Sequence, residues 1–372
     1  MERKSILPEE LVLKLDEETN NFDLARYEDF LYELCGEWDF QKEAIRNSLR
    51  FFLSKKYENT EELFNENYDK NLEMQNFQDR ISMSKNLPFP HKKSCTIDLA
   101  TGTGKSWVMY GVARILLAEG LVDQVLVLCP SITIKQELTK KFKSFARNSV
   151  LTDSLPKNSI IKVPRIKHSD GTIEKGDICI DNVHKTYDHV SSSINDSLFE
   201  KGSKTLVIND EAHHILNPKG AGDSAKMLEW KKFLDDERFG FEFILNLTGT
   251  PYKGDSYFND VIYRFSIRNA ISKKFVKEIN YLEKDESRNE EEKWKAIIDR
   301  HDSIKKEYSK AKKHITIVVT NSISKTDEIV EKIKKYIKKF TKCAKEEIDE
   351  KVIPITSSNK HEKYREILKN VD

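Results

Sequence analysis

The chain has 372 residues, with 63 basic and 62 acidic side chains and a formal net charge of +1. Hydrophobic residues make up 38% of it, which permits real cores, and its length permits two or three domains. The small net charge excludes a uniformly basic surface, so any contact with nucleic acid must be a local groove. No stretch is long and apolar enough to span a membrane, and residues 1–10 lack the apolar core of a signal peptide. We therefore expect a cytoplasmic protein without membrane partners.

The five cysteines show no pairing pattern. No two of them form a CxxC pair, and their number is odd. Three lie in apolar, strand-like runs, which favours buried free thiols in a reducing compartment over disulfides or a zinc site. The cysteines are Cys35, Cys95, Cys129, Cys179 and Cys343.

Residues 1–90 are expected to form a helical N-terminal extension. Phe30 and Leu34 fall on one helical face, and residues 44–53 form a second amphipathic run. Residues 54–93 are polar and rich in asparagine and lysine. We interpret them as a family-specific insertion before the main sheet.

From residue 95 onward, short apolar runs alternate with helical patterns, and this alternation defines a domain at residues 91–272. Alternating strands and helices at this spacing predict an α/β fold, in which a parallel sheet is covered by helices on both faces. The strand candidates are residues 95–99, 124–129, 178–180, 205–209 and 243–247, and the helix candidates between the first of them are 105–119 and 134–146.

Residues 273–372 predict the start of a second α/β domain. The charged stretch 284–313 indicates one long helix or a helical pair, and residues 329–340 have apolar positions at helical spacing. Residues 315–319 predict a buried strand. A weaker strand at 352–355 and a last helix at 360–368 complete the pattern. Two strands bury a parallel sheet poorly, so we expect this second domain to be incomplete.

Residues 100–106 read ATGTGKS between a predicted strand and a predicted helix. In this setting backbone N–H groups and a helix N-terminus bind phosphates, which predicts an ATP site rather than a chance glycine-rich turn. Lys105 is expected to reach the β- and γ-phosphates and Ser106 to bind Mg²⁺. Leu99 stands where the full GxxxxGK[ST] pattern has glycine. The expected nucleotide-binding residues of this loop are Thr101, Gly102, Thr103, Gly104, Lys105 and Ser106.

A second acidic motif follows the strand candidate at 205–209. The strand delivers Asp210 and Glu211 at its carboxyl end, where ligands bind in α/β sheets. Asp210 is suited to hold Mg²⁺ and Glu211 to polarise the attacking water. The alternative is a helix N-terminus decorated with acids. His213 and His214 also suggest a metal-binding pair. This interpretation is the weaker one, because adjacent histidines rarely chelate one ion.

The order of four motifs resembles that of superfamily 2 helicases and translocases of the DEAD/DEAH-like class, which have RecA-like P-loop domains. Residues 210–213 read DEAH, and residues 247–251 read LTGTP. The resemblance implies that His213, Thr248 and Thr250 couple hydrolysis to motion. Lys105, Asp210, Glu211 and His213 would then be the catalytic set.

Two further motifs fit the same resemblance. Gln41, after Phe40, resembles the upstream glutamine that reads adenine. Pro130 and Ser131 resemble the motif that grips a nucleic-acid phosphate. The wording of residues 99–106, 130–134, 209–214 and 247–252 is most similar to that of the helicase (Res) subunit of type III restriction enzymes, and the resemblance covers roughly residues 35–270. That similarity implies double-stranded DNA as the preferred track, with RNA still open, and a methyltransferase or specificity subunit as a possible partner.

The chain also departs from that pattern. It has no QxxGRxGR string to supply an arginine finger, and its late arginines, Arg288, Arg300 and Arg365, lie in other settings. A PD…(D/E)xK nuclease triad is not evident either. We therefore expect a C-terminally truncated chain that binds ATP but hydrolyses it poorly without a missing C-terminal portion. Robust unwinding by the isolated chain would contradict this. The alternative function is a nucleotide-binding fragment or regulator.

Three weaker features remain open. The lysine-rich run at 332–345 fits a solvated helix face better than a phosphate track. Trp38, Tyr187 and Tyr252 fit ordinary core or surface roles better than base stacking. Residues 182–185 follow a strand candidate where a further nucleic-acid motif would fall, and they support either interpretation equally.

Overall fold

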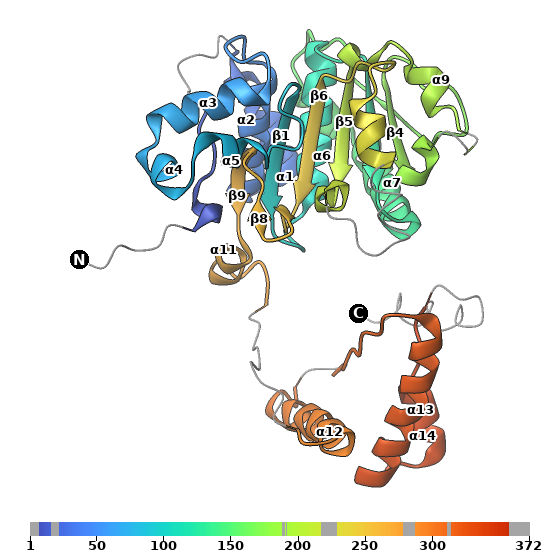
Figure 1. Cartoon of the computed structure of the whole chain (residues 1–372). Helices are drawn as coiled ribbons and strands as arrows, with labels where there is room; N and C mark the ends of the chain where they lie inside the picture. Colours follow the sequence, from blue (N-terminus) through green and yellow to red (C-terminus); the bar gives the residue numbers. More distant parts are fainter. Residues whose placement is uncertain are drawn as a thin grey trace. The chain divides into compact units, whose positions relative to one another are not determined.

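The computed structural model describes residues 7–15, 22–187, 190, 192–216, 229–277, 287–310 and 314–356 (Figure 1). The chain forms two compact units, Met1–Glu278 and Ile279–Asp372. The predicted division at residues 1–90, 91–272 and 273–372 is finer than this, and it stays a prediction.

A seven-stranded parallel sheet forms the centre of the first unit, which confirms the predicted α/β fold. Its order is β3-β4-β2-β5-β6-β1-β9. All five strand candidates of this region lie in it, and two further strands, β3 and β9, were not predicted. The strands are β1 (Lys93–Leu99), β2 (Gln124–Cys129), β3 (Arg165–Lys167), β4 (Asp177–Asn182), β5 (Thr205–Asp210), β6 (Phe243–Thr248) and β9 (Val261–Phe265). The strands β7 (Tyr252–Lys253) and β8 (Ser256–Tyr257) form a separate antiparallel pair.

Two hydrophobic cores lie on the two faces of this sheet. Val125 and Val127 of β2 belong to one core, and Leu126 and Leu128 belong to the other. This alternation follows from the two-residue period of a strand and explains why the runs are apolar throughout. The first core also contains Ile45 and other residues of the N-terminal helices. The N-terminal helices therefore share one core with the sheet.

The helices of the first unit are mostly short, and many begin at a side-chain cap. Asn59, Ser131 and Ser266 each accept a hydrogen bond from the first turn of the helix that follows. The α-helices are α1 (Glu28–Cys35), α2 (Asp39–Phe52), α3 (Thr60–Lys70), α4 (Leu72–Phe77), α5 (Arg80–Ser84), α6 (Lys105–Glu119), α7 (Ile132–Arg147), α8 (Ser149–Asp153), α9 (Ile194–Leu198) and α11 (Ile267–Ser272). The 3₁₀ turns are η1 (Pro8–Glu10), η3 (Leu24–Tyr27), η4 (Val183–Thr186), η5 (Gly202–Lys204) and η6 (Ala212–Ile215).

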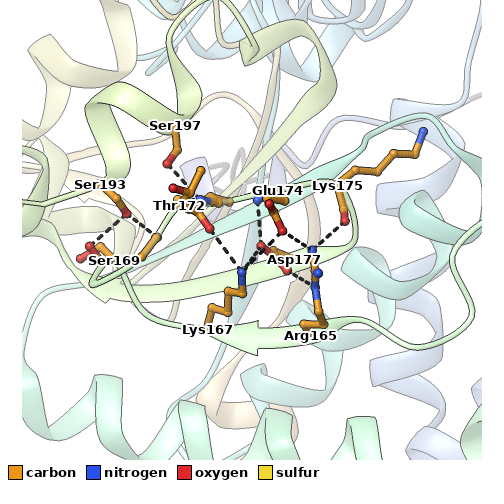
Figure 2. A network of polar contacts seen from close by, with 11 residues as sticks. Arg165, Lys167, Ser169, Thr172, Glu174, Lys175, Asp177, Ser193 and Ser197 are labelled. Carbon is orange, nitrogen blue, oxygen red and sulfur yellow. Dashed lines mark hydrogen bonds and ion pairs between the residues drawn. The ribbon is translucent and has the colours of Figure 1, made fainter.

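The edge strand β3 has charged residues on both sides of Ile166, and these residues form ion pairs. Arg165 Nε donates to Asp177 Oδ1 at 2.6 Å, and Lys167 Nζ lies 3.1 Å from Asp177 Oδ2 (Figure 2). In the same view, Ser193 donates to the backbone carbonyl of Ser169. Short, charged edge strands resist pairing with other chains. Because β3 has so few apolar residues, its sequence gives no strand pattern.

A buried ladder of side-chain hydrogen bonds crosses the middle of the sheet. Asn209 Nδ2 on β5 donates to Asn246 Oδ1 on β6 at 2.9 Å, and Asn246 Nδ2 donates to Ser94 Oγ on β1 at 3.3 Å. Trp230 Nε1 donates to Asn209 Oδ1 at 3.1 Å. Because each of these polar groups is buried, the ladder favours one register of the three central strands.

The four cysteines in the first unit are buried free thiols, and Cys343 is a half-buried free thiol. This confirms the interpretation of the cysteines as unpaired. Of the helices in the described ranges, none combines the length and the apolar composition needed to cross a membrane.

The second unit contains the helices α12 (Glu290–Glu307), α13 (Ile323–Phe340) and α14 (Lys345–Lys351). The first two confirm the predicted helices at 284–313 and 329–340. The strands predicted at 315–319 and 352–355 are wrong, because neither stretch forms a strand; Val319 is 88% exposed. An apolar run becomes a buried strand only when another strand pairs with it, and the described part of this unit supplies none. The helix predicted at 360–368 lies outside the described residues.

The lysine-rich run of α13 makes ion pairs within the second unit. Lys332 contacts Glu290 at 2.9 Å, and Lys339 contacts Glu291 at 2.6 Å. These contacts fit the interpretation of the lysine-rich run as a solvated helix face. Exposed ion pairs of this kind add little to the free energy of unfolding.

Replacing Asn246 should destabilise the first unit. In Asn246→Ala the buried Asn209 amide loses its acceptor, so we expect the free energy of unfolding to fall by about 1–3 kcal/mol. Urea unfolding followed by circular dichroism measures this change. The control Asn76→Ala, at an exposed position of α4, should stay within about 0.5 kcal/mol of the parent. Equal stabilities of the two variants would show that the ladder adds nothing.

Candidate functional site

The loop between β1 and α6 has the tight curl that the sequence predicts. Gly102 has φ 84° and Gly104 has φ 83°, a left-handed conformation that favours glycine. Thr103 closes the loop, because its Oγ1 donates to the carbonyl of Ala100 at 2.6 Å. Lys105 is the first residue of α6, so the loop opens directly onto a helix N-terminus. This arrangement aims backbone N–H groups and a partial positive charge at one point.

Two close approaches leave no room for larger residues around the loop. A Cβ atom on Gly104 would overlap the side-chain amide of Gln41. A Cβ atom on Gly249, in the turn after β6, would lie 2.9 Å from the carbonyl oxygen of Leu99. The turn at 248–250 therefore packs directly against the loop at 100–104. Such a glycine-lined cradle fits a phosphate group.

Asp210 and Glu211 lie at the same edge of the sheet as this loop. Asp210 is the last residue of β5 and is buried. Glu211 follows with φ 50°, an uncommon backbone conformation for a residue other than glycine. Lys105 Nζ lies 2.5 Å from Glu211 Oε1. The structure thus brings together the lysine and the two acids that the sequence singled out. Carboxylate and hydroxyl oxygens, as on Asp210 and Ser106, are suitable Mg²⁺ ligands.

Burial raises the pKa of Asp210 to about 6. The negative charge of the adjacent Glu211 contributes to this rise, whereas the positive charges of Lys105 and Lys141 oppose it. A metal cation stabilises the charged form of a buried carboxyl, so metal binding would lower this pKa again.

A hydrogen-bonded chain joins the acidic motif to the turn after β6. His213 Nδ1 lies 2.8 Å from Thr248 Oγ1, which also accepts a hydrogen bond from the backbone N–H of Thr250 at 3.1 Å. His213 Nδ1 is 3.6 Å from Glu211 Oε2. The rings of His213 and His214 lie 4.2 Å apart. Within the described ranges no group of three or more histidine, cysteine, aspartate or glutamate residues could hold a metal ion.

Gln41 contacts the loop itself. Its Nε2 donates to the backbone carbonyl of Thr103 at 2.8 Å, and the side chain is buried. Phe40, the preceding residue, stacks on Phe265 with ring centroids 4.1 Å apart. The glutamine motif is therefore anchored next to the loop.

The residues predicted to contact nucleic acid lie at the carboxyl ends of two other strands. Pro130 and Ser131 follow β2, and Ser131 Oγ accepts a hydrogen bond from the N–H of Ile134 as the cap of α7. The segment 182–185 follows β4, where Asn182 Oδ1 accepts a hydrogen bond from the N–H of His184 at 2.9 Å. Both segments lie at the same edge of the sheet as the phosphate loop.

The three aromatic residues that were considered for base stacking make contacts within the protein. Trp38 is 37% exposed and lies 5.4 Å from Phe275 between ring centroids. Tyr187 is buried, and Tyr252 is hydrogen-bonded to the carboxylate of Glu9. These contacts fit structural roles.

Two groups near the loop were not anticipated from the sequence. Asp98, just before the loop, accepts hydrogen bonds from Tyr257 at 2.8 Å and from Arg264 at 3.1 Å. Lys141 Nζ on α7 lies 3.5 Å from Ser106 Oγ. Lys141 is one of several lysines on α7, and helical spacing alone does not distinguish it from its neighbours.

The raised pKa of Asp210 predicts a pH-dependent cost to stability. The pKa is 3.8 for an ordinary aspartate and about 6 in the folded protein. The stabilising contribution of protonated Asp210 is therefore full below pH 3.8 and is lost as the pH rises through about 6. Asp210→Asn should be more stable than the parent by about 1–3 kcal/mol at neutral pH, and the difference should shrink toward pH 4.

Thermal unfolding at several pH values measures this effect. The control Asp153→Asn, at an exposed position, should follow the parent at every pH. If Asp210→Asn and the parent differed by the same amount at all pH values, the carboxyl would not have the raised pKa.

The family model described as "Type III restriction enzyme, res subunit" matches residues 38–253, which is more than half of the chain. The match includes the loop at 100–106, the acidic motif at 210–213 and the turn at 247–251. No curated protein matches the chain.

Several solved structures have similar folds at low sequence identity. The UvsW helicase from bacteriophage T4 is 14% identical, with 47% of this chain and 55% of that chain covered and a TM-score of 0.28. The type ISP restriction-modification enzyme LlaBIII, bound to DNA, is 14% identical, with 63% and 15% covered and a TM-score of 0.38. A nuclease-deletion mutant of the related enzyme LlaGI, with a DNA substrate mimic, is 13% identical, with 72% and 22% covered and a TM-score of 0.37.

This chain spans about half or less of the length of those three proteins. The family model covers residues 38–253, more than half of the chain. The chain therefore belongs to the family of type III restriction enzyme res subunits.

Proposed function

We propose that the chain is an ATP-dependent DNA helicase or translocase module, which hydrolyses ATP with Mg²⁺ and moves on double-stranded DNA in a restriction or phage-defence system. The observation that carries this proposal is the 2.5 Å contact between Lys105 and Glu211. It joins the glycine-lined loop to the acidic motif. A lysine and a carboxylate meeting beside such a loop is the arrangement that phosphoryl transfer to water requires.

The residues around this contact suit a nucleotide and its metal. Backbone N–H groups of the loop and the ammonium group of Lys105 would hold the phosphates, and Ser106 and Asp210 would hold Mg²⁺. When bound, Mg²⁺ would neutralise charge on the phosphates. Gln41, anchored on the loop, would contact the adenine.

Glu211 would orient water and accept its proton. In the structure Lys105 Nζ donates to this carboxylate at 2.5 Å. A contact of Lys105 with the phosphates instead would leave the Glu211 carboxylate available as a base. The ion pair therefore holds both groups at the same site.

His213, Thr248 and Thr250 would couple ATP hydrolysis to movement of the rest of the motor. The 2.8 Å contact between His213 and Thr248 links the segment after Glu211 to the turn that packs on the phosphate loop. A change at Glu211 would alter both segments together. DNA would cross the carboxyl edge of the sheet at Pro130 and Ser131, mainly through its phosphates.

The partners follow from the family rather than from contacts in the chain. A methyltransferase or specificity subunit, or a further C-terminal portion of the motor, would complete the system. The proposed domains are a helical extension at 1–90, a first RecA-like domain at 91–272 and the start of a second at 273–372.

A second candidate function is a nucleotide-binding fragment or regulator with little activity alone. The described residues of the second unit favour it, because they form helices without a strand and therefore show no second RecA-like sheet. In that case the chain would bind ATP, and turnover would need a second polypeptide.

Substitutions at Lys105 and Glu211 should separate binding from hydrolysis. Lys105→Ala should weaken binding of a fluorescent ATP analogue by about tenfold or more, because a charge contact to the phosphates is lost. Glu211→Gln should retain binding and lower hydrolysis by about 10²–10⁴-fold. Fluorescence anisotropy and phosphate release measure the two effects, with Lys140→Ala, at an exposed position of α7, as the charge-matched control. Unchanged binding by Lys105→Ala would remove the basis of the proposal.

Nucleic acid should stimulate ATP hydrolysis by the motor. We expect duplex DNA to raise the rate more than single-stranded DNA or RNA, and added salt to reduce the stimulation because phosphate contacts dominate binding. Steady-state ATPase assays with each nucleic acid measure this. Nucleotide binding without stimulation by any of them would favour the regulator.

A further inference from the structure

A second lysine, Lys141, reaches the proposed metal-binding edge of the site from α7. Its Nζ lies 3.5 Å from Ser106 Oγ. The same ammonium group lies 5.2 Å from the centroid of the Trp107 ring. The cation–π contact with Trp107 holds the lysine next to the hydroxyl that follows the phosphate loop.

A second ammonium group lies at the same site. Lys105 Nζ is 2.5 Å from Glu211 Oε1. The two lysines therefore have different partners: Lys105 contacts Glu211, and Lys141 lies 3.5 Å from the Ser106 hydroxyl.

We propose that Lys141 is the resident cation of the magnesium position. Its ammonium group lies beside the Ser106 hydroxyl and would give way to Mg²⁺ when the metal binds with the nucleotide. This inference rests on the proposed ATP site, and it adds a residue outside the four motifs that define that site.

Electrostatics requires the exchange. A metal ion bound to Ser106 and Asp210 would lie within a few ångströms of the observed Lys141 ammonium group, and two cations at that distance repel each other. Lys141 can move because its side chain is exposed and its contact with Ser106 is long. A contact of this kind is weak, so the lysine would compete with the metal without blocking it.

The exchange has a measurable consequence for nucleotide binding. Without Mg²⁺, Lys141 would supply the charge that the metal normally supplies, so the protein would still bind nucleotide. Removing the Lys141 charge should therefore weaken binding without metal, and it should make the metal itself bind more readily.

The test uses the full chain and a fluorescent ADP analogue, with anisotropy measured in EDTA and along a Mg²⁺ titration. Lys141→Met keeps a flexible apolar side chain against Trp107 and removes the charge. It should weaken binding in EDTA by about three- to tenfold and lower the Mg²⁺ concentration at half-saturation by a similar factor. Lys141→Arg should behave like the parent. Lys143→Met, at an exposed position of the same helix, removes an equal charge and should also behave like the parent.

Two results would overturn the inference. Equal loss of affinity with and without Mg²⁺ would place Lys141 on the phosphates instead of at the metal position. Identical behaviour of Lys141→Met and Lys143→Met would show that nucleotide binding depends on the overall charge of α7 and not on the position of Lys141. Circular dichroism verifies folding, and if Lys141→Met were unfolded, Lys141→Gln would take its place in the same comparison. Failure of the parent to bind nucleotide under either condition would overturn the ATP site itself, which distinguishes the two failures.

Discussion

The register of three parallel strands is the constraint on which the site depends. Leu247 of β6 pairs with Ile97 of β1 on one side and with Asp210 of β5 on the other. The segments that follow β1 and β5 therefore leave the sheet at the same edge, and Lys105 and Glu211 meet at 2.5 Å. A shift of one residue in either pairing would turn every side chain of that strand to the opposite face and separate the two groups. The buried asparagine ladder favours the observed register.

Much of the fold and most of the candidate site could be predicted because their signals are local. A buried parallel strand needs a continuous apolar run, as at 124–129, and a phosphate loop needs glycines with left-handed backbone just before a helix. The edge strand β3 carries charged residues and gives no such run. Lys141 escaped prediction for a different reason, because its role depends on how α7 packs beside α6.

The second unit shows the limit of the same reasoning. The run at 315–319 has the composition of a buried strand, yet Ile317 is 80% exposed and Val319 is 88% exposed. Composition describes what a segment prefers when a partner is present, and pairing with another strand decides whether it forms. Helices at 290–307 and 323–340 form because their hydrogen bonds are internal to each segment.

The central claim is that Lys105, Ser106, Asp210 and Glu211 surround one triphosphate and its metal. Crystals of the chain grown with a non-hydrolysable ATP analogue and Mn²⁺ in place of Mg²⁺ test it directly, because the anomalous signal of manganese locates the metal. The account predicts a manganese peak between the Ser106 hydroxyl and the Asp210 carboxylate, with the phosphates in the loop at 100–105. A nucleotide bound elsewhere, or a manganese peak remote from Asp210, would contradict it.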